Sequence, residues 1–211
     1  MIGDLGASAL RVLVGFAVAY LLAVPVGIAM GLHRGLARAL SGILALLRPL
    51  SPPAWIPLAI LWFGIGDAPA IFIIFVGTFA ALLLGAGSAT QHLDEQWLDA
   101  AATLGASRVQ VLLTVVLPGL LPSLLSLARM GLGLAWMCVI AAEMVAVRRG
   151  VGFMMSEARN LFRTDDVMVG MIAIGLIGLG TDALVGRIER TFCRWRGDVG
   201  PTLSKGQGPV S

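Results

Sequence analysis

One acidic side chain, Glu143, lies inside an otherwise apolar stretch that reads Ala-Ala-Glu-Met-Val. An ionisable group in such a stretch is costly unless it faces a water-filled cavity or a charged partner. Glu143, together with Trp136 on the same stretch, is therefore a candidate for lining or gating a route through a membrane. The alternatives are that Glu143, five residues before Arg148, reaches the outer interface of the membrane and pairs there, and that Trp136 is an interfacial anchor or a packed side chain.

Four arginines follow Glu143 in the chain and precede the last apolar run. Such a basic group could attract an anionic solute or dock the acidic surface of another protein from outside the membrane. Ordinary solvated loop charge is the alternative. The four candidates for external docking are Arg148, Arg149, Arg159 and Arg163.

The remaining residues do not form a recognisable catalytic or metal site. Lys205 is the only lysine, so the sequence contains no Gly-x-x-x-x-Gly-Lys-Ser/Thr loop and we expect no ATP binding through one. His33 and His92 have no cysteine or second histidine nearby, and Cys138 and Cys193 do not make a disulfide framework. We therefore expect no metal site, no cofactor and no enzymatic activity in this chain.

A polar segment, residues 94–118, separates two apolar runs and predicts two short helices joined at Gly105. Ala100 and Ala101 leave the first helix thin, so that a groove on a partner could approach its backbone. Gly105 predicts the end of this helix because glycine accepts a left-handed backbone. Carboxylates at the start of the helix complement the positive end of its dipole, and they belong to Asp94, Glu95 and Asp99.

The second half of this segment predicts a helix that begins at Ser107. Ser107 and Gln110 have the spacing of a capping box, in which each side chain bonds to the other residue's backbone N–H. Pro118 predicts the end of that helix at Leu117, because the residue before a proline is pushed out of the helical conformation. The segment is then a helix, a glycine elbow and a helix; the alternative is an ordinary helical hairpin that links two membrane spans.

The composition is that of an integral membrane protein. Of the 211 residues 58% are hydrophobic and 13% are charged, and the mean hydropathy is +0.92. The arginines are scattered among apolar runs instead of lining one basic face, which argues against nucleic-acid binding. A membrane span requires roughly 20 apolar residues. The apolar runs predict five spans, of which the second is short, rich in proline and able to begin as an irregular or tilted segment: residues 7–32, 49–65, 69–89, 130–147 and 167–185.

Small residues recur every four positions along the first predicted span. Small residues at this spacing let helix backbones approach closely, within one subunit or between two copies. Plain abundance is the alternative, because the chain has 27 glycines. The stripe consists of Gly15, Ala19, Ala23, Gly27, Gly31 and Gly35.

The distribution of basic residues predicts which ends lie in the cytoplasm, since loops rich in arginine and lysine stay on that side. Nine basic residues belong to the first connection, the segment 94–118 and the C-terminus, against the four outer arginines, so we expect that segment and the C-terminus inside the cell. Residues 1–196 are expected to form one membrane domain and residues 197–211 a disordered cytoplasmic tail. Five spans then place the N-terminus outside, which favours a missing upstream helix over translocation of a short tail.

The order of residues in segment 94–118 resembles the cytoplasmic coupling loop, or EAA motif, of the permease subunits of binding-protein-dependent ATP-binding cassette (ABC) importers. The matching positions are Asp99, Ala100, Ala101, Gly105, Leu117 and Pro118. The family more often has glutamate at the place of Asp99, a change that keeps the charge. Further similarity, to the nitrate, sulfonate and taurine branch of this family, is carried by residues 47–50, 55–66, 133–136, 141–144 and 150–152.

This resemblance implies an all-α, multi-pass protein of the bacterial inner membrane with the type I ABC importer permease (MetI-like) fold. It implies a homodimer of permease copies, each docked on a cytoplasmic ABC ATPase that binds ATP and Mg²⁺, with a periplasmic or lipid-anchored solute-binding protein outside. The solute would be small and anionic or organic, of the nitrate, sulfonate or taurine kind. The competing hypothesis is a secondary transporter driven by an ion gradient, but such carriers pair buried ionisable residues, and Glu143 is nearly alone in the predicted spans.

Overall fold

The computed structural model describes residues 2–47, 50–93, 96–97, 101 and 103–192. All regular secondary structure in these ranges is helical, which confirms the predicted fold class. The predicted tail, residues 197–211, and the motif residues Asp99 and Ala100 lie outside the described ranges. In chain order the elements are α1 (Ile2–Leu32), α2 (Arg34–Leu47), η1 (Pro52–Trp55), α3 (Ile56–Phe63), α4 (Asp67–Gln91), α6 (Arg108–Val111), η2 (Leu112–Val116), α7 (Leu117–Ala146), α8 (Val151–Asn160) and α9 (Thr164–Phe192).

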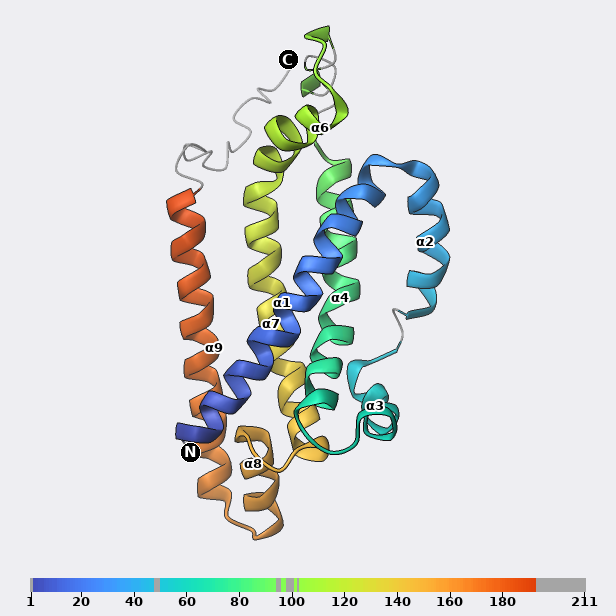
Figure 1. Cartoon of the computed structure of the whole chain (residues 1–211). Helices are drawn as coiled ribbons and strands as arrows, with labels where there is room; N and C mark the ends of the chain where they lie inside the picture. Colours follow the sequence, from blue (N-terminus) through green and yellow to red (C-terminus); the bar gives the residue numbers. More distant parts are fainter. Residues whose placement is uncertain (1, 48–49, 94–95, 98–100, 102, 193–211) are drawn as a thin grey trace, which may run out of the picture.

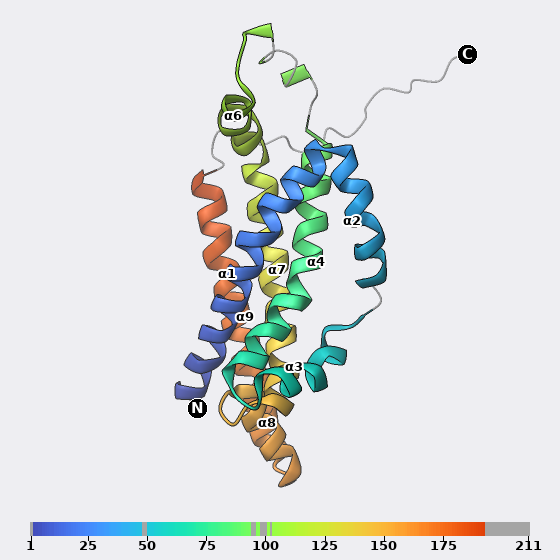
Figure 2. The same ribbon diagram turned by 45° about the vertical axis from the view of Figure 1, so that its right-hand side comes forward.

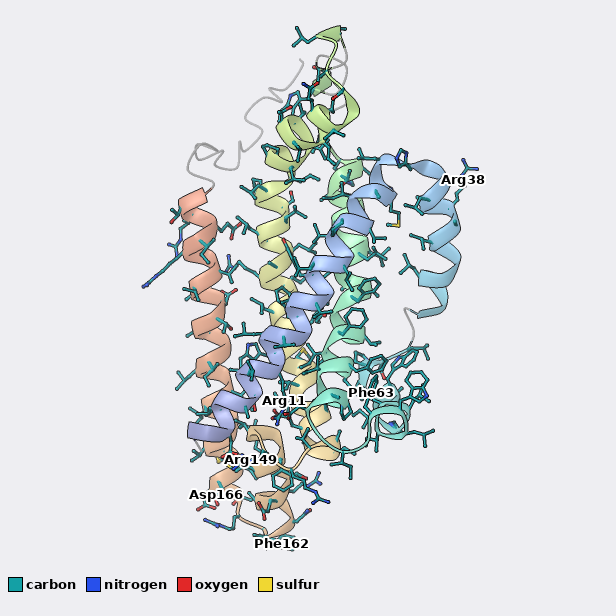
Figure 3. The ribbon with its side chains drawn as sticks, in the orientation of Figure 1. Arg11, Arg38, Phe63, Arg149, Phe162 and Asp166 are labelled. Carbon is teal, nitrogen blue, oxygen red and sulfur yellow. The ribbon has the colours of Figure 1, made fainter. Side chains whose placement is uncertain are left out.

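Four of these helices, α1, α4, α7 and α9, run between the two ends of an elongated bundle (Figure 1). α1, α4 and α9 run from the end that carries α8 to the end that carries α6, and α7 runs the opposite way. We call these the α8 end and the α6 end. After a turn of 45° the four helices still form one bundle, with α2 along its edge (Figure 2). Arg38, predicted on the cytoplasmic side, lies toward the α6 end, and Arg149, predicted on the outer side, lies at the α8 end (Figure 3).

In the described part of the chain, four helical segments are long and apolar enough to cross a membrane: Gly3–Leu32, Asp67–Gln91, Val109–Ala146 and Thr164–Thr191. They contain the first, third and fifth predicted spans and all of the fourth except Val147.

The second predicted span, residues 49–65, corresponds to a short and irregular apolar segment, as its prolines indicated. α2 turns back from the α6 end, and η1 with α3 then forms only a shorter apolar segment, Pro52–Phe63. Proline lacks the backbone N–H that an interior helical position needs, so Pro52 and Pro53 fall in a 3-10 turn and Pro57 in the first turn of α3.

The predicted helix end at Leu117 was wrong, because a continuous helical segment runs from Val109 to Ala146. Pro118 has no N–H to donate, and in a regular α-helix its ring would clash with the carbonyl four residues before it. η2 resolves this conflict by forming a π-helical stretch just before the proline, in which the Leu117 N–H bonds to the carbonyl of Leu112, five residues back. The fourth span is therefore longer than the predicted residues 130–147.

The stripe of small residues on α1 packs against α4 of the same chain. A Cβ atom on Gly27 would lie 2.6 Å from the carbonyl oxygen of Leu83, and one on Gly15 would lie 2.8 Å from the side chain of Ile74. The stripe thus has a packing role, as one of the two interpretations expected, although Gly35 has open space around it. The residues that lie at this contact are Gly15, Ala19, Ala23, Gly27 and Gly31.

Replacing Gly27 by alanine is expected to lower the free energy of unfolding by about 1–3 kcal/mol, the usual cost of overpacking, because the methyl group would meet the α4 backbone. The matched change Gly180→Ala places a methyl group in open space on α9, so stability should be unchanged or slightly higher through better helix propensity. Thermal unfolding of the purified chain in detergent, followed by size exclusion, measures both. Equal effects would contradict the close α1–α4 contact.

Candidate functional sites at the two ends of the bundle

At the α6 end the chain turns at Gly105, whose backbone is left-handed with a φ of 75°. The N–H of Ala106 donates to the carbonyl of Ala101, five residues back, at 3.1 Å. This bond is typical of a Schellman motif, which ends a helix at a left-handed glycine. The predicted glycine turn is therefore present, and a residue with a Cβ atom at this position would be strained.

The predicted capping box follows directly. The Ser107 N–H donates to Gln110 Oε1 at 2.8 Å, and the Gln110 N–H donates to Ser107 Oγ at 3.4 Å. α6 therefore begins just after the glycine turn and continues through η2 into α7. We call residues 103–111 the elbow. The elbow is thus continuous with the long helical segment Val109–Ala146.

The elbow stands beyond the bundle (Figures 1 and 2), and it exposes large apolar side chains. Leu104 is 87% exposed and Val109 is 64% exposed. The segment Val109–Ala146 has 38 residues, which makes it about 57 Å long, whereas a hydrocarbon core is about 30 Å thick. One end of this helix must therefore stand outside the membrane, and apolar side chains exposed there are typical of a protein-binding surface.

A cleft of about 940 Å³ lies between the elbow and the neighbouring ends of α4 and α7. Ala101 and Pro118, two of the predicted coupling residues, line this cleft, together with Leu104 of the elbow. Leu117 is exposed next to Pro118. The structure thus places the four described residues of the predicted motif at the α6 end. Their contact with another protein stays a prediction.

At the α8 end, Glu143 is fully buried and forms an ion pair with Arg11 of α1. Arg11 Nη1 donates to Glu143 Oε1 at 2.5 Å and to the carbonyl of Arg149 at 2.7 Å. Its Nε donates to Oδ1 of Asp67, the first residue of α4, at 2.8 Å. Ser8 Oγ donates to Glu143 Oε2 at 2.8 Å. We call Ser8, Arg11, Asp67 and Glu143 the clasp; Figure 3 labels Arg11 and Arg149 in this region.

The start of α8 completes the clasp with backbone N–H groups. The Gly152 N–H donates to Glu143 Oε2 at 3.0 Å, and the Val151 N–H donates to Ser8 Oγ at 3.1 Å. A Cβ atom on Gly150, whose φ is 133°, would lie 2.5 Å from the carboxyl carbon of Glu143. Only glycine lets the chain pass this close to the carboxylate. The clasp thus joins α1, α4, α7 and α8, and the buried charges have the partners that burial requires.

Glu143 was predicted from its place in an apolar stretch, but its partner Arg11 was not predicted. Arg11 lies within the first predicted span, where an arginine is as unusual as an acid in the fourth. Glu143 forms an ion pair at the α8 end, but its partner is Arg11. Arg148, five residues after Glu143, is exposed. Trp136 is buried in the core, and its Nε1 donates to Thr181 Oγ1 of α9 at 3.2 Å. The roles of Glu143 and Trp136 in gating or solute contact stay predictions.

The four predicted docking arginines lie at the α8 end, and all four are exposed. Arg163 Nη2 pairs with Asp166 Oδ2 at 2.7 Å, so this arginine is partly neutralised. Just before it, Phe162 is 91% exposed and has a φ of 55°, which makes it an apolar tip of the connection between α8 and α9 (Figure 3). The surface is therefore basic with one aromatic tip, and its role in docking stays a prediction.

The remaining ionisable groups form no metal site in the described ranges, but one further ion pair lies between two spans. In the described part of the chain, no three His, Cys, Asp or Glu side chains are placed to hold a metal ion. The expectation that Glu143 is nearly alone in the spans was wrong, because Arg129 of α7 pairs with Asp182 of α9 in addition to the clasp. Arg129 lies one residue before the predicted fourth span, and Asp182 lies inside the fifth, where its charge was overlooked.

Comparison with known proteins agrees with this architecture. Residues 23–192 match the family described as binding-protein-dependent transport system inner membrane component. The chain is 42% identical over 190 residues to a putative ABC transporter permease protein of Methanocaldococcus jannaschii, covering 90% of this chain and 71% of that protein. It is 38% identical over 195 residues to the taurine transport system permease protein TauC of Escherichia coli, covering 92% and 71%. It is 32% identical over 185 residues to the nitrate import permease protein NrtB of Leptolyngbya laminosa, covering 88% and 66%.

The fold is similar to that of a solved chain from the inward-facing MetNI methionine ABC transporter. The TM-score is 0.83 at 18% identity, with 91% of this chain and 95% of that chain covered, and this likeness confirms the predicted MetI-like fold. The family match and the permease relatives favour an ABC importer over the competing secondary transporter. With its apolar helices and this family match, the chain is a multi-pass membrane protein that belongs to the binding-protein-dependent ABC importer permeases, in the taurine, sulfonate and nitrate branch.

Proposed function

We propose that two copies of this chain form a route through the cell's inner membrane for a small anionic or organic solute, and that each elbow docks a cytoplasmic ABC ATPase. ATP and Mg²⁺ would bind to that ATPase, and a periplasmic or lipid-anchored binding protein would deliver the solute to the α8 end. The observation that carries the proposal is the exposed elbow, which leads into the same helical segment that holds Glu143 of the clasp.

The elbow and the clasp lie near the two ends of the helical segment Val109–Ala146. Closure of the two ATPases on ATP would draw the two elbows together. Because a helix resists compression and bending, the far end of α7 would follow. The clasp ties this far end to α1, α4 and α8, so the four helices would move as a unit and open or close the outer mouth of the route. Glu143 acts here as a positioning residue.

The proposed solute class is supported by the relatives and by the charge of the α8 end. Three relatives are named for taurine, aliphatic sulfonates and nitrate. The exposed arginines at the α8 end would raise the local concentration of an anion and would attract an acidic surface of a binding protein. Selection among these solutes is proposed to reside largely in the binding protein.

The docking of the ATPase is tested by Gly105→Val, with Gly64→Val as the matched control. Both glycines have a positive φ, of 75° and 74°, and open space around them. Valine is therefore strained at either position, and at least as much at Gly64, whose ψ of −166° lies in a region used almost only by glycine. Gly105→Val should strongly reduce co-purification of the ATPase and ATP-driven uptake into proteoliposomes, because it reshapes the elbow. Gly64→Val, outside the elbow, should reduce neither. Normal coupling in Gly105→Val would refute docking through the elbow.

The clasp is tested by Glu143→Gln. Removing one charge of a buried ion pair is expected to cost up to about 3–5 kcal/mol of unfolding free energy, and Arg11→Gln/Glu143→Gln should recover part of this loss. In proteoliposomes, Glu143→Gln should also lower the ratio of solute taken up to ATP hydrolysed. Asp67→Asn, at a partner whose side chain is 69% exposed, is the control and should be milder. An unchanged ratio in Glu143→Gln would mean that the clasp does not transmit the movement.

Electrostatic docking is tested by changing all four outer arginines to glutamine. The association rate of the binding protein should fall at low salt, and the difference from the unmodified transporter should shrink as salt screens the charges, since the Debye length is about 8 Å at 0.15 M. Arg187→Gln/Arg190→Gln, at exposed arginines near the other end of α9, is the control. Biolayer interferometry at two salt concentrations measures the rates. A rate that does not depend on the outer arginines would remove the case for steering.

A further inference from the structure

A third ionic contact joins α7 and α9 away from both sites described above. Arg129 of α7 donates from Nε and Nη2 to the two carboxylate oxygens of Asp182, at 2.9 and 2.7 Å. Its Nη1 donates to Glu189 Oε2 at 3.3 Å, and Ser126 Oγ donates to Glu189 Oε1 at 2.9 Å. We call Ser126, Arg129, Asp182 and Glu189 the α7–α9 cluster.

The cluster lies toward the elbow end of both helices. Arg129 is seventeen residues before Ala146, and Asp182 is eighteen residues after Thr164. At a rise of 1.5 Å per residue, both residues are about 25–27 Å from the α8 end of their helices, and Glu189, twenty-five residues after Thr164, is about 37 Å from it. A hydrocarbon core is about 30 Å thick. For a core that begins at the α8 end of these helices, Arg129 and Asp182 fall in its elbow half and Glu189 falls beyond it.

The chain itself does not shelter these charges. The side chains of Arg129, Asp182 and Glu189 are 40%, 47% and 23% exposed. Charged groups in contact with lipid tails are strongly disfavoured, so this face of the bundle is not a lipid face. Leu176 and Leu184, which α9 also exposes, point to other sides of the helix at 100° per residue and suit lipid.

Open space borders the cluster on the side toward the α8 end. Gly133 follows Arg129 by four residues on α7, and Gly178 and Gly175 precede Asp182 by four and seven residues on α9. Residues at these spacings share a helix face. No atom lies within 4 Å of a Cβ built on any of the three glycines. We call these three glycines the glycine strip; it leaves open space beside the cluster along both helices, on a face where α9 also exposes Met171.

Water suits this surface better than another apolar helix. Arg129 has five N–H donors, and Asp182 and Glu189 accept from three of them. An apolar helix that covered the cluster would leave the remaining two donors without acceptors, which is unfavourable. Water would satisfy both and would keep the half-exposed carboxylates hydrated.

We propose that the α7–α9 cluster and the glycine strip form a water-exposed wall of the solute route in its cytoplasmic half. This inference rests on the proposed importer function. Two carboxylates outweigh one guanidinium, so the wall offers hydrogen bonds and carries a net negative charge. Within the cluster the two carboxylates neutralise the guanidinium of Arg129, so Arg129 does not retain an anionic solute that leaves toward the elbow end.

Thiol accessibility in the assembled transporter tests this wall. In a background that carries Cys138→Ala and Cys193→Ala, Gly133→Cys and Gly178→Cys report on the strip, and Leu176→Cys reports on the apolar side of α9. Inside-out membrane vesicles are treated with a charged methanethiosulfonate, which reacts with the thiolate. The strip cysteines should react at least about tenfold faster than Leu176→Cys, because only a hydrated thiol ionises readily.

Two results would contradict the proposed water-exposed wall. Reaction of the strip cysteines as slow as that of Leu176→Cys would show a lipid face, and a disulfide between two copies through Gly178→Cys would show a helix interface. Both are measured in transporters that still hydrolyse ATP with their ATPase partner. A failure of the wall in such an assembly leaves the proposed function intact, whereas a chain that never binds an ATPase refutes the proposed function.

A charge experiment separates the wall from a merely structural contact. Asp182→Asn/Glu189→Gln leaves the charge of Arg129 uncompensated and should slow nitrate or taurine uptake several-fold while ATP hydrolysis continues. Adding Arg129→Gln to this pair removes the free cation and should restore uptake. If the contact only holds α9 to α7, the triple variant will be at least as impaired as the double variant, and the proposal fails.

Discussion

The buried ion pair between Arg11 and Glu143 is the constraint on which the α8 end of the bundle depends. Two charges taken out of water are unfavourable unless the geometry is good and the remaining donors and acceptors are satisfied. Here the carboxylate also accepts from Ser8 and Gly152, and the guanidinium also reaches Asp67. These partners come from α1, α4, α7 and α8, so the pair is stable only when the four helices meet. The ion pair and the packing of these four helix ends therefore stabilise each other.

The same constraint reaches the other end of the molecule through α7. Pro118 would clash with the preceding turn of an ordinary α-helix, and η2 relieves this clash with a wider π-helical turn next to the elbow. The elbow and Glu143 thus lie near the two ends of one helical segment. Such π-helical bulges are frequent at functional sites. The helical segment is therefore continuous, and its π-helical stretch can change shape where a partner protein would bind the elbow. The clasp holds the other end of α7 in place against α1, α4 and α8.

Local signals in the sequence predicted the elbow, because Gly105 and the capping box after it act through backbone geometry over a few residues. The clasp could not be predicted in this way. Arg11 and Glu143 are 132 residues apart, and no local pattern says that they meet. Hydropathy identified the four long spans, and the prolines within residues 49–65 indicated the short, irregular second segment. The proline rule wrongly ended a helix at Leu117, since whether a proline ends a helix or follows a π-helical turn depends on tertiary packing.

The ionic contacts of the bundle differ in burial, and this difference determines which helix can move. Breaking the Arg11–Glu143 pair would leave a buried charge, which is strongly unfavourable. The Arg129–Asp182 pair is exposed, so water can replace either partner and the contact holds α9 only weakly. Small residues also pack α1 closely against α4, whereas α9 is the least buried of the four candidate spans in the described ranges. We therefore expect α9 to shift against the other helices during transport. A structure of the outward-facing state in which the clasp is broken and the α7–α9 cluster is intact would contradict this expectation.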